Sequence, residues 1–453
     1  MLISVKIKTV FAEGDMNLDT FPVIKLSNQQ RRCRALLMLF SPMSAVQLET
    51  ISRFNGVAPT VSRQDIAQIS DEINQLYHLD ICIQANNFCQ IEGKLLDKRL
   101  CLIDCLRRGL RYCPEFIDNY FSVDLYRALA LELHQVNNWL KPQLQKIMEC
   151  CEKLLSQPFS ERDRRFLPIY IFYCAWENQQ QRSLHLKTNQ RDWLNQKRER
   201  AAANILFHSI NPLLPTPLAT IERDMIILML TMLKTHNYSN SNSVEDTRLM
   251  NSVHNMICRF QRFSEVSFSN KTALASQLYS HLAPAIARCY FNIGVDNLLL
   301  DRITSKYPRL LRTTQQALVD FEREYQIEFS SEEIGLIAIS FGAWLMQSNA
   351  LQEKQVLLLT RDNSQLEEEL ERQIRELTIL PLHIKYYPLD KYLQCDTPPD
   401  DALVITPYFV LSPPLTSSLI QALLPLTKQQ SEQIRMLLEA PQHPTSNSLG
   451  VGA

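Results

Sequence analysis

The chain has 453 residues, of which 47 are basic and 48 acidic, so its formal net charge is −1. This length is typical of about three domains, and the ordinary balance of apolar and charged residues excludes a disordered or fibrous chain. Only 9 residues are glycine, and the sequence contains neither a GxGxxG nor a GxxxxGK[ST] loop. The composition therefore argues against a Rossmann dehydrogenase and a P-loop NTPase, and it favours a mainly helical protein.

Nothing in the sequence predicts a membrane span or a secretory signal. Apolar runs such as residues 225–233 and 334–346 are far shorter than the ~20 residues that a bilayer requires, and charged residues interrupt the N-terminal stretch. The 12 cysteines form no CxxC pair. We expect them to be buried thiols of a cytoplasmic protein, with a zinc site or a disulfide framework as the alternative, and we predict no cofactor and no metal ion.

The N-terminal part has the element order of a DNA-binding module. Residues 1–28 show no clear period and are expected to form a flexible arm. Residues 29–112 contain three predicted helices, the third of which has Pro59 in its first turn. Two short alternating runs then flank residues 85–87 and predict a β-hairpin. Three helices and a hairpin in this order indicate a winged helix-turn-helix.

The third helix supplies the candidate DNA contacts. In a helix-turn-helix the second helix of the pair enters the major groove, where arginine pairs with guanine and glutamine with adenine. The predicted base contacts are Thr60, Ser62, Arg63, Gln64 and Gln68. The candidates for phosphate contacts are Arg31, Arg32, Arg34 and Arg53.

The charge of this part leaves its role open. The third helix carries one arginine against Asp65, Asp71 and Glu72, and the hairpin has neither lysine nor arginine. Affinity for DNA depends largely on neutralisation of phosphates, so a site this poor in cations is expected to bind weakly. Retained DNA binding and a winged helix that serves as a dimer or protein contact are both compatible with the sequence.

The middle of the chain is helical almost throughout and contains a weak internal repeat. At a separation of 111 residues, Glu222 and Glu333 each open an apolar helix. Residues 166–176 and 278–289 also occupy corresponding places. The expected segments are a helical connector over 113–160 and two related helical bundles over 161–255 and 265–350.

Beyond residue 350 the pattern changes to strands that alternate with helices. The run Ala402–Thr406 (ALVIT), for example, is typical of a buried strand. We predict a small parallel α/β domain over 354–440 and a loose tail over 441–453. Residues 351–453 hold 8 basic and 13 acidic side chains, whereas residues 1–112 hold 14 basic and 11 acidic ones. The near-neutral net charge therefore combines a mildly basic N-terminal part with an acidic C-terminal part.

This order of parts resembles bacterial transcription regulators that contain phosphotransferase-system regulation domains (PRDs). Five stretches carry the resemblance: residues 57–66 (VAPTVSRQDI), residues 281–288 (HLAPAIAR), residues 297–308 (NLLLDRITSKYP), the pair Glu333-Ile334, and residues 400–406 (DDALVIT). Within that family the chain is most similar to a subfamily that enteric bacteria induce in stationary phase.

The resemblance implies a mainly α fold with four parts. These are an N-terminal winged helix-turn-helix, two all-helical PRD bundles, and a small C-terminal α/β domain like enzyme IIB of the phosphotransferase system. It also implies a homodimer, DNA as a partner, and phosphocarrier proteins of the phosphotransferase system as possible partners.

The resemblance also implies where phosphate would be accepted. Active members present histidines in each PRD, and His281 is the candidate phosphoacceptor here, with Arg288 as its phosphate contact. The other corresponding positions hold Tyr170, Met229 and Ser340, which cannot replace an imidazole nucleophile. Thr360-Arg361 stands where enzyme IIB has its cysteine. A lone histidine on an amphipathic helix can equally be a hydrogen-bonded structural residue.

Two functional hypotheses follow. The first is a transcription-regulator-like protein whose DNA-binding winged helix is controlled by two largely degenerate PRDs in stationary phase. The alternative is an adaptor without DNA binding that acts by protein–protein contact. An enzyme is not predicted, because no nucleophile–base pair is visible in the sequence.

Overall fold

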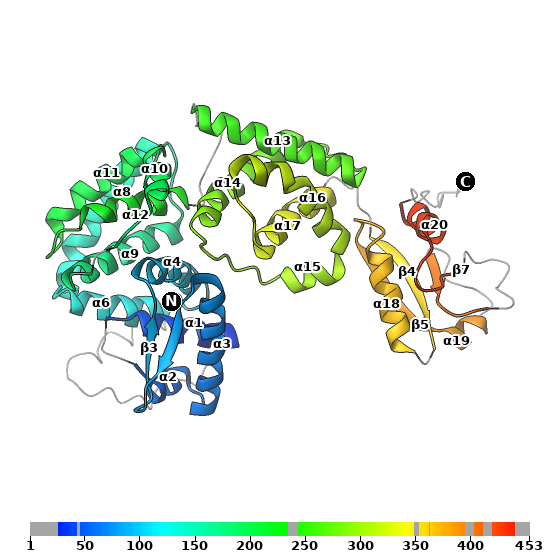
Figure 1. Cartoon of the computed structure of the whole chain (residues 1–453), viewed down its shortest axis with the longest axis horizontal. Helices are drawn as coiled ribbons and strands as arrows, with labels where there is room; N and C mark the ends of the chain where they lie inside the picture. Colours follow the sequence, from blue (N-terminus) through cyan, green and yellow to red (C-terminus); the bar gives the residue numbers. More distant parts are fainter. Residues whose placement is uncertain are drawn as a thin grey trace, which may run out of the picture. The chain divides into compact units, whose positions relative to one another are not determined.

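The computed structural model describes residues 26–42, 46–182, 184–233, 243–347, 353–361, 363–394, 403–410 and 419–439. Nearly all of the predicted N-terminal arm and all of the predicted C-terminal tail lie outside these ranges. The chain divides into two compact units, one that ends at Leu133 and one that begins at His134. Figure 1 shows that most elements are helices and that the C-terminal part contains a small sheet. The mainly helical fold is thus confirmed.

The first unit contains the three helices and the hairpin that the sequence predicts. Its helices are α1 (Asn28–Phe40), α2 (Leu48–Asn55), α3 (Pro59–Tyr77) and α4 (Leu95–Tyr112). Its strands are β1 (Val46–Gln47), β2 (Asp80–Ile83) and β3 (Phe88–Glu92), which form an antiparallel sheet in the order β1-β3-β2. The two-residue strand β1, which the sequence analysis did not predict, makes the sheet three-stranded. Three short helical segments end the unit: α5 (Pro114–Phe116), η2 (Ile117–Phe121) and α6 (Ser122–Ala128).

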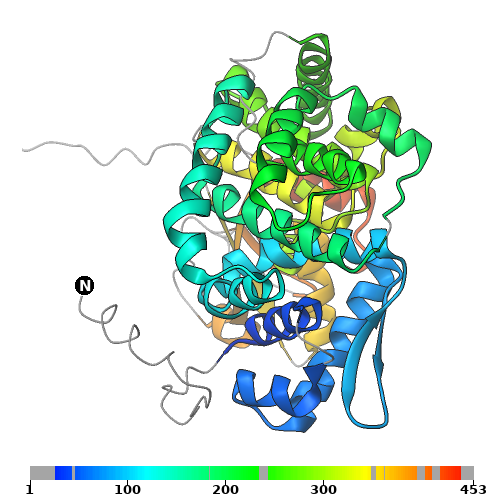
Figure 2. The ribbon, with the colours of Figure 1, turned by 90° about the vertical axis from the view of Figure 1, so that its left-hand side faces the viewer.

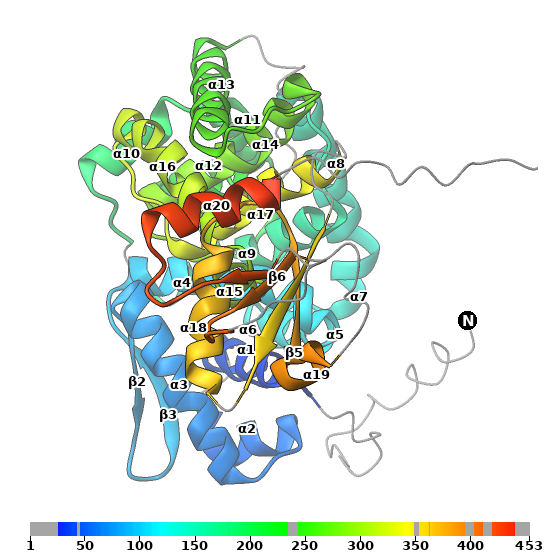
Figure 3. The same cartoon turned by 90° about the vertical axis from the view of Figure 1, so that its right-hand side faces the viewer.

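The turn between α2 and α3 requires a glycine. Gly56 closes α2 with a φ of 63°, and its N–H donates back to the carbonyl of Arg53. This left-handed conformation is accessible to glycine without steric cost. Pro59 then occupies the first turn of α3, as predicted. The buried face of α3 includes Ile66, Ile69 and Ile73, and β2 lies beside this helix (Figure 3).

The second unit contains two copies of one helix pattern. The first copy comprises α8 (Lys141–Leu155), α9 (Glu161–Gln179), α10 (Thr188–Asn195), α11 (Arg200–Ile210) and α12 (Thr220–Thr231). The second comprises α13 (Val244–Ser264), α14 (Lys271–Tyr290), α15 (Leu300–Lys306), α16 (Pro308–Tyr325) and α17 (Ser331–Gln347). The first residues of α9 and α14 are 110 apart, those of α10 and α15 are 112 apart, and those of α12 and α17 are 111 apart. The repeat therefore extends over five helices.

The positions of these helices differ from the bounds expected for the two bundles. α8 follows the short segments α7 (Leu133–Gln135) and η3 (Val136–Leu140), and it ends 109 residues before α13 ends. It packs against α11 (Figure 2). The thiol of Cys151 on α8 donates to the carbonyl of Ala202 on α11 at 3.5 Å. We therefore propose that residues 134–155, expected to belong to a connector, are part of the first bundle, with α8 as its first long helix.

The boundary expected at residue 255 lies inside α13. This helix lies across α14 and α16 (Figure 1), and its apolar side chains, such as Val253 and Phe260, are part of the core of the second bundle. We therefore propose repeat bounds near 134–233 and 243–347. The sequence pattern gave shorter bounds because it was based on the apolar helices that open with glutamate, whereas α8 and α13 are amphipathic.

The C-terminal part is a parallel α/β domain, as predicted. Its strands are β4 (Lys354–Thr360), β5 (Leu382–Pro388), β6 (Leu403–Thr406) and β7 (Leu419–Gln421), in the sheet order β5-β4-β6-β7. Its helices are α18 (Ser364–Arg375), α19 (Leu389–Leu393) and α20 (Lys428–Glu439) (Figure 3). Alternate residues of β4 enter two cores. Val356 and Leu358 pack with residues of α18 and α20, and Leu357 and Leu359 pack with residues of α19.

Two kinds of feature are absent from the described residues. None of their helices is both long enough and apolar enough to cross a bilayer. No group of three or more histidine, cysteine, aspartate or glutamate side chains among them is placed to hold a metal ion.

The revised start of the first repeat can be tested with two fragments. A fragment of residues 134–453 should unfold cooperatively, whereas one of residues 161–453 should not, because it lacks α8. That helix buries Leu144, Met148, Cys151 and Leu155. Together they contribute roughly 6 kcal/mol or more, which is comparable to the whole stability of a domain. Thermal unfolding followed by circular dichroism checks this, and equal melting curves for the two fragments would contradict the assignment.

Candidate functional site

The predicted phosphoacceptor and its partner lie on one helix and meet a carboxylate from another. His281 and Arg288 are seven residues apart on α14, which places them two turns apart on the same face. Glu333 lies in the first turn of α17, which packs against α14. The guanidinium Nε of Arg288 donates to Oε1 of Glu333 at 2.5 Å. The imidazole Nε2 of His281 lies 3.2 Å from Oε2 of the same carboxylate.

This cluster lies at the edge of the bundle core. The side chains of Glu333 and Arg288 are 3% and 6% exposed, whereas that of His281 is 23% exposed. Burial raises the pKa of Glu333, but the charge of Arg288 and the hydrogen bonds from both neighbours outweigh it and lower that pKa to about 2. The carboxylate is therefore ionised at any physiological pH.

An ionised Glu333 lies beside the histidine ring, with its Oε2 3.2 Å from Nε2. A carboxylate oxygen only accepts hydrogen bonds, so it favours the imidazole tautomer that carries its proton on Nε2. The lone pair of the neutral ring is then on Nδ1, the nitrogen that is not directed at Glu333. The neighbouring thiol of Cys289 is not a competing nucleophile, because burial and the charge of Glu333 raise its pKa to about 12.

From the sequence, a chemical role was predicted for two of the three residues in this cluster, His281 and Arg288. It placed Arg288 near His281 but assigned it to phosphate, whereas the structure shows its Nε bound to Glu333. Glu333 was noted only as the acidic start of an apolar helix. The signal that could have revealed its role is the apolar sequence after it, since a glutamate at the start of such a helix is buried and requires a cation.

The corresponding positions of the first repeat hold a different set of side chains. Tyr170 and Met229 are buried, and Ser340 of the second repeat donates its hydroxyl to the carbonyl of Leu336 at 3.2 Å. At the same offset of 111 residues, Glu177 corresponds to Arg288 and Glu222 to Glu333. Both glutamates are 2% exposed. The first repeat thus has tyrosine and two glutamates where the second has histidine, arginine and glutamate.

In the first unit, four of the five predicted base contacts are on the surface of α3. Thr60, Arg63, Gln64 and Gln68 are exposed. Ser62 is fully buried and forms a hydrogen bond of 2.9 Å with the hydroxyl of Ser52 on α2. The prediction for Ser62 is therefore wrong. Adjacent residues of a helix are rotated by about 100° from each other, so Ser62 faces the core while its neighbour Arg63 faces solvent.

The acidic residues of α3 are largely neutralised within the unit. Asp65 is buried and accepts from Nε and Nη2 of Arg31 at 2.9 and 3.2 Å. Glu72 pairs with Arg108 of α4 at 2.5 Å. Asp71 is exposed on the same face as Arg63. The exposed face of α3 is thus close to neutral rather than acidic, and Arg31 is engaged with Asp65 rather than available to a phosphate.

The other candidate phosphate contacts differ in their surroundings. Nη1 of Arg32 donates to the side-chain oxygen of Gln68 at 3.3 Å, so it lies next to the exposed face of α3. The guanidinium of Arg34 lies 5.4 Å from the ring centre of Phe116. Arg53 is exposed in the last turn of α2. In the hairpin, Asp80 is paired directly opposite Glu92, so this part of the surface repels a phosphate backbone.

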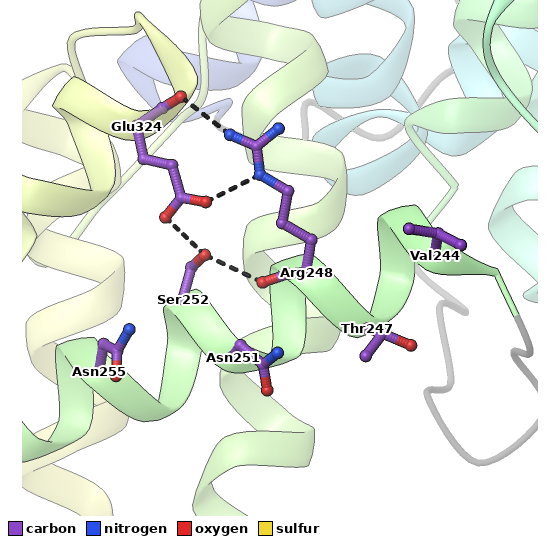
Figure 4. Close-up of a pocket in the computed structure, with 7 residues that line it drawn as sticks. All are labelled: Val244, Thr247, Arg248, Asn251, Ser252, Asn255 and Glu324. Carbon is purple, nitrogen blue, oxygen red and sulfur yellow. Dashed lines mark hydrogen bonds and ion pairs between the residues drawn. The ribbon is translucent and has the colours of Figure 1, made fainter.

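A polar groove lies between α13 and α16. Its volume is about 460 Å³, and it is lined by Val244, Thr247, Arg248, Asn251, Ser252, Asn255 and Glu324. Figure 4 shows that three of the polar residues bind one another: Nε of Arg248 donates to Glu324 at 2.8 Å, and Ser252 donates to the other carboxylate oxygen at 2.7 Å. Burial raises the pKa of Glu324, but the hydrogen bonds from Arg248 and Ser252 outweigh burial, so the pKa lies below its ordinary value. An ionised, fully engaged carboxylate is a poor general acid, so the groove indicates no catalytic pair.

Comparison with known proteins defines the class of the second repeat. Residues 254–344, which span most of α13 and all of α14 to α16 together with the histidine–arginine–glutamate cluster, match the family model of the PRD domain. The chain therefore contains a PRD domain, which confirms the resemblance seen in the sequence. The match begins inside α13, in agreement with the place of this helix in the second bundle.

Residues 354–438 match the model described as the C-terminal domain of the stationary phase-inducible protein CsiE. The chain is also 36% identical over 419 residues to the stationary phase-inducible protein CsiE of Escherichia coli (strain K12). That alignment covers 92% of this chain and 98% of its relative. The chain belongs to the CsiE family.

The buried ion pair leads to a prediction about stability. Glu333→Gln should destabilise the second repeat by about 3 kcal/mol at pH 7, because it leaves the charge of Arg288 buried without a partner. The folded pKa of Glu333 lies below its unfolded value. Its contribution is therefore complete above about pH 4.5 and is lost as the pH falls toward about 2.

Thermal unfolding of wild type and variant at several pH values measures this difference. The two melting temperatures should converge as the pH falls from 4.5 toward 2. Glu332→Gln is the matched control, because Glu332 is next in the chain and lies outside the cluster, where it accepts a hydrogen bond from Ser331 at 3.2 Å. A difference between wild type and Glu333→Gln that stays constant with pH would contradict the assignment.

Proposed function

We propose that the chain is a PRD-type transcription regulator of the cytoplasm that binds DNA through a winged helix in its first unit. The observation that carries this proposal is the exposed face of α3. It presents Thr60, Arg63, Gln64 and Gln68, while Asp65 and Glu72 are neutralised by arginines of α1 and α4. Arginine and glutamine side chains in this arrangement are suited to the edges of guanine and adenine.

The proposed input is the His281 cluster of the second repeat. A phosphocarrier protein would transfer its phosphoryl group to Nδ1, the ring nitrogen that Glu333 leaves with a lone pair. The added charge would lie beside the buried carboxylate of Glu333, which it repels, and beside Arg288, which it attracts. Because Arg288 joins α14 to α17 through Glu333, the modification would change the packing of these two helices.

Three further parts of the proposal rest on resemblance. The name of the CsiE relative supports a role in stationary phase, and family analogy supports a homodimer in which the winged helices move relative to each other. We do not propose an enzyme. Support for this comes from the high pKa of the Cys289 thiol on α14 and from the paired groups of the α13–α16 groove.

A second candidate function is that of an adaptor that acts by protein–protein contact. The observation that favours it is the scarcity of cations around α3. Arg63 shares its face with Asp71, and the hairpin places Asp80 opposite Glu92. A winged helix that binds protein rather than DNA does not require a positive surface.

DNA binding distinguishes the two functions. In fluorescence anisotropy at low salt, the wild-type chain should bind its own upstream DNA with sequence selectivity, and Arg63→Ala should lower the affinity about tenfold. Gln75→Ala, an exposed change near the other end of α3, should leave the affinity unchanged. With Arg32, Arg53 and Arg63 as the cations near DNA, of which Arg53 and Arg63 are exposed, the logarithmic salt slope should be about −3 or shallower. If the wild type shows no selective binding, the adaptor is the better description.

Phosphorylation of the cluster is tested separately. With phosphoenolpyruvate and phosphotransferase-system phosphocarriers, the wild-type chain should take up an acid-labile phosphate label, and His281→Ala should abolish it. His254→Ala is the control, because Nδ1 of His254 lies 2.8 Å from the carbonyl of Met250 on its own helix and outside the cluster. Equal labelling of wild type and His281→Ala would exclude His281 as the acceptor.

A further inference from the structure

Two cysteine thiols of the first unit are in contact although they are 80 positions apart in the chain. The Sγ atoms of Cys33 on α1 and of Cys113, which directly follows α4, lie 3.8 Å apart. The two residues are 9% and 4% exposed. A disulfide has its sulfurs at about 2 Å, and side-chain rotation can close the remaining gap if the two backbones are already close to each other.

The backbones at this place are held close together. One turn before Cys33, Nε2 of Gln30 donates to the carbonyl of Tyr112, the residue before Cys113, at 3.0 Å. On α4, Gly109 leaves no room for a side chain, because a Cβ there would lie 2.9 Å from a side-chain carbon of α1. The two helices thus pack closely on both sides of the thiol pair, which can therefore be joined without moving them apart.

A third thiol, that of Cys105, lies near the pair but is less suited to a cross-link. Cys33 donates to the carbonyl of Cys105 at 4.0 Å. Cys105 is fully buried in the middle of α4, and burial raises the pKa of its thiol well above the ordinary value. Cys113, in contrast, follows the last turn of α4 with φ −144° and ψ 54°. Its side chain can turn toward Cys33 without disturbing the helix.

The hydrogen bond between the two thiols assigns them different roles. The thiol of Cys113 donates to the sulfur of Cys33. This hydrogen bond and burial raise the pKa of Cys113, although the charge of Arg34 acts in the opposite direction. Cys113 therefore keeps its proton at physiological pH. Cys33 accepts the hydrogen bond and is the more exposed of the two, so it is the sulfur that meets an oxidant first.

We propose that Cys33 and Cys113 form a reversible disulfide when the chain is exposed to hydrogen peroxide. The sulfur of Cys33 attacks one peroxide oxygen and the O–O bond breaks, which gives a sulfenic acid and a hydroxide that takes the Cys33 proton and becomes water. The sulfur of Cys113 then attacks the sulfenic sulfur. The S–S bond forms, the S–O bond breaks, and a second water leaves with the Cys113 proton. The two thiols lose two electrons, and the peroxide gains them.

The disulfide joins α1 to the segment that follows α4. In this segment Phe116 packs edge to face on Phe54 of α2, with ring centres 6.4 Å apart, and α1 is bound to α3 through the pair of Arg31 and Asp65. The closed loop contains α2, α3, the hairpin and α4, so the cross-link restricts the unfolded chain and stabilises the first unit. The proposal is independent of DNA binding and of phosphate on His281.

The test uses the full chain with two exposed cysteines replaced by Cys150→Ser and Cys258→Ser. After treatment with hydrogen peroxide, non-reducing digestion and mass spectrometry should find the peptides of Cys33 and Cys113 joined, and dithiothreitol should separate them. The first unit of the oxidised chain should melt about 5 °C higher than that of the reduced chain. In concentrated urea the same treatment should give no preference for this pair, because the fold no longer holds the two thiols together.

A matched pair of variants completes the test. Cys113→Ala should abolish both the cross-link and the rise in melting temperature, whereas Cys82→Ala, a change at a half-buried thiol of β2, should preserve both. The peptide map remains decisive if Cys113→Ala does not fold, because it requires no substitution in the pair. A link from Cys33 to Cys105 instead, or an equal yield of the pair in urea, would overturn the proposal. So would recovery of both thiols in reduced form at a peroxide dose that fully oxidises Cys150 of the wild-type chain.

Discussion

The burial of carboxylates is the constraint on which the candidate sites of this protein depend. An ionised carboxylate that leaves water costs several kcal/mol unless a charge or a set of hydrogen bonds compensates for it. Glu333 satisfies this condition through Arg288 and His281, Asp65 through Arg31, and Glu367 through the Arg361 N–H and the Tyr408 hydroxyl. In each case the carboxylate connects elements that are distant in the sequence, so its need for partners also determines how those elements pack.

The two repeats of the second unit show how one arrangement of helices accommodates different chemistry. Their helices have nearly the same spacing, yet the polar groups at equivalent positions differ in charge. Arg288 compensates Glu333 in the second repeat, whereas Glu177 at the equivalent position of the first pairs with Arg182 at 3.3 Å, from the end of its helix. Where the second repeat has the buried Arg288, the first repeat therefore has the buried Glu177 and a more exposed arginine, Arg182, as its partner. The imidazole of His281 has no counterpart in the first repeat, where the equivalent position holds Tyr170.

Much of the fold could be predicted because it depends on local pattern. The period of apolar residues gave the helices, Pro59 marked the start of α3, and a continuous apolar run gave the buried strand β6. The parts that could not be predicted depend on residues distant in the sequence. Asp65 meets Arg31 across 34 positions, and Glu367 meets Tyr408 across 41. The periodicity of apolar residues gives no information about such pairs. The burial of Ser62 was missed for a related reason, since the helical phase was not known to within one residue.

The replacement of three histidine positions by Tyr170, Met229 and Ser340 has a consequence for the form of any signal the chain receives. A protein with several acceptors can weigh one donor against another and can respond in graded steps. Under the proposed function His281 is the single acceptor among these four positions, and the modified fraction of each chain would then follow one simple saturation curve. A response steeper than that curve would have to arise between copies of the chain rather than within one copy.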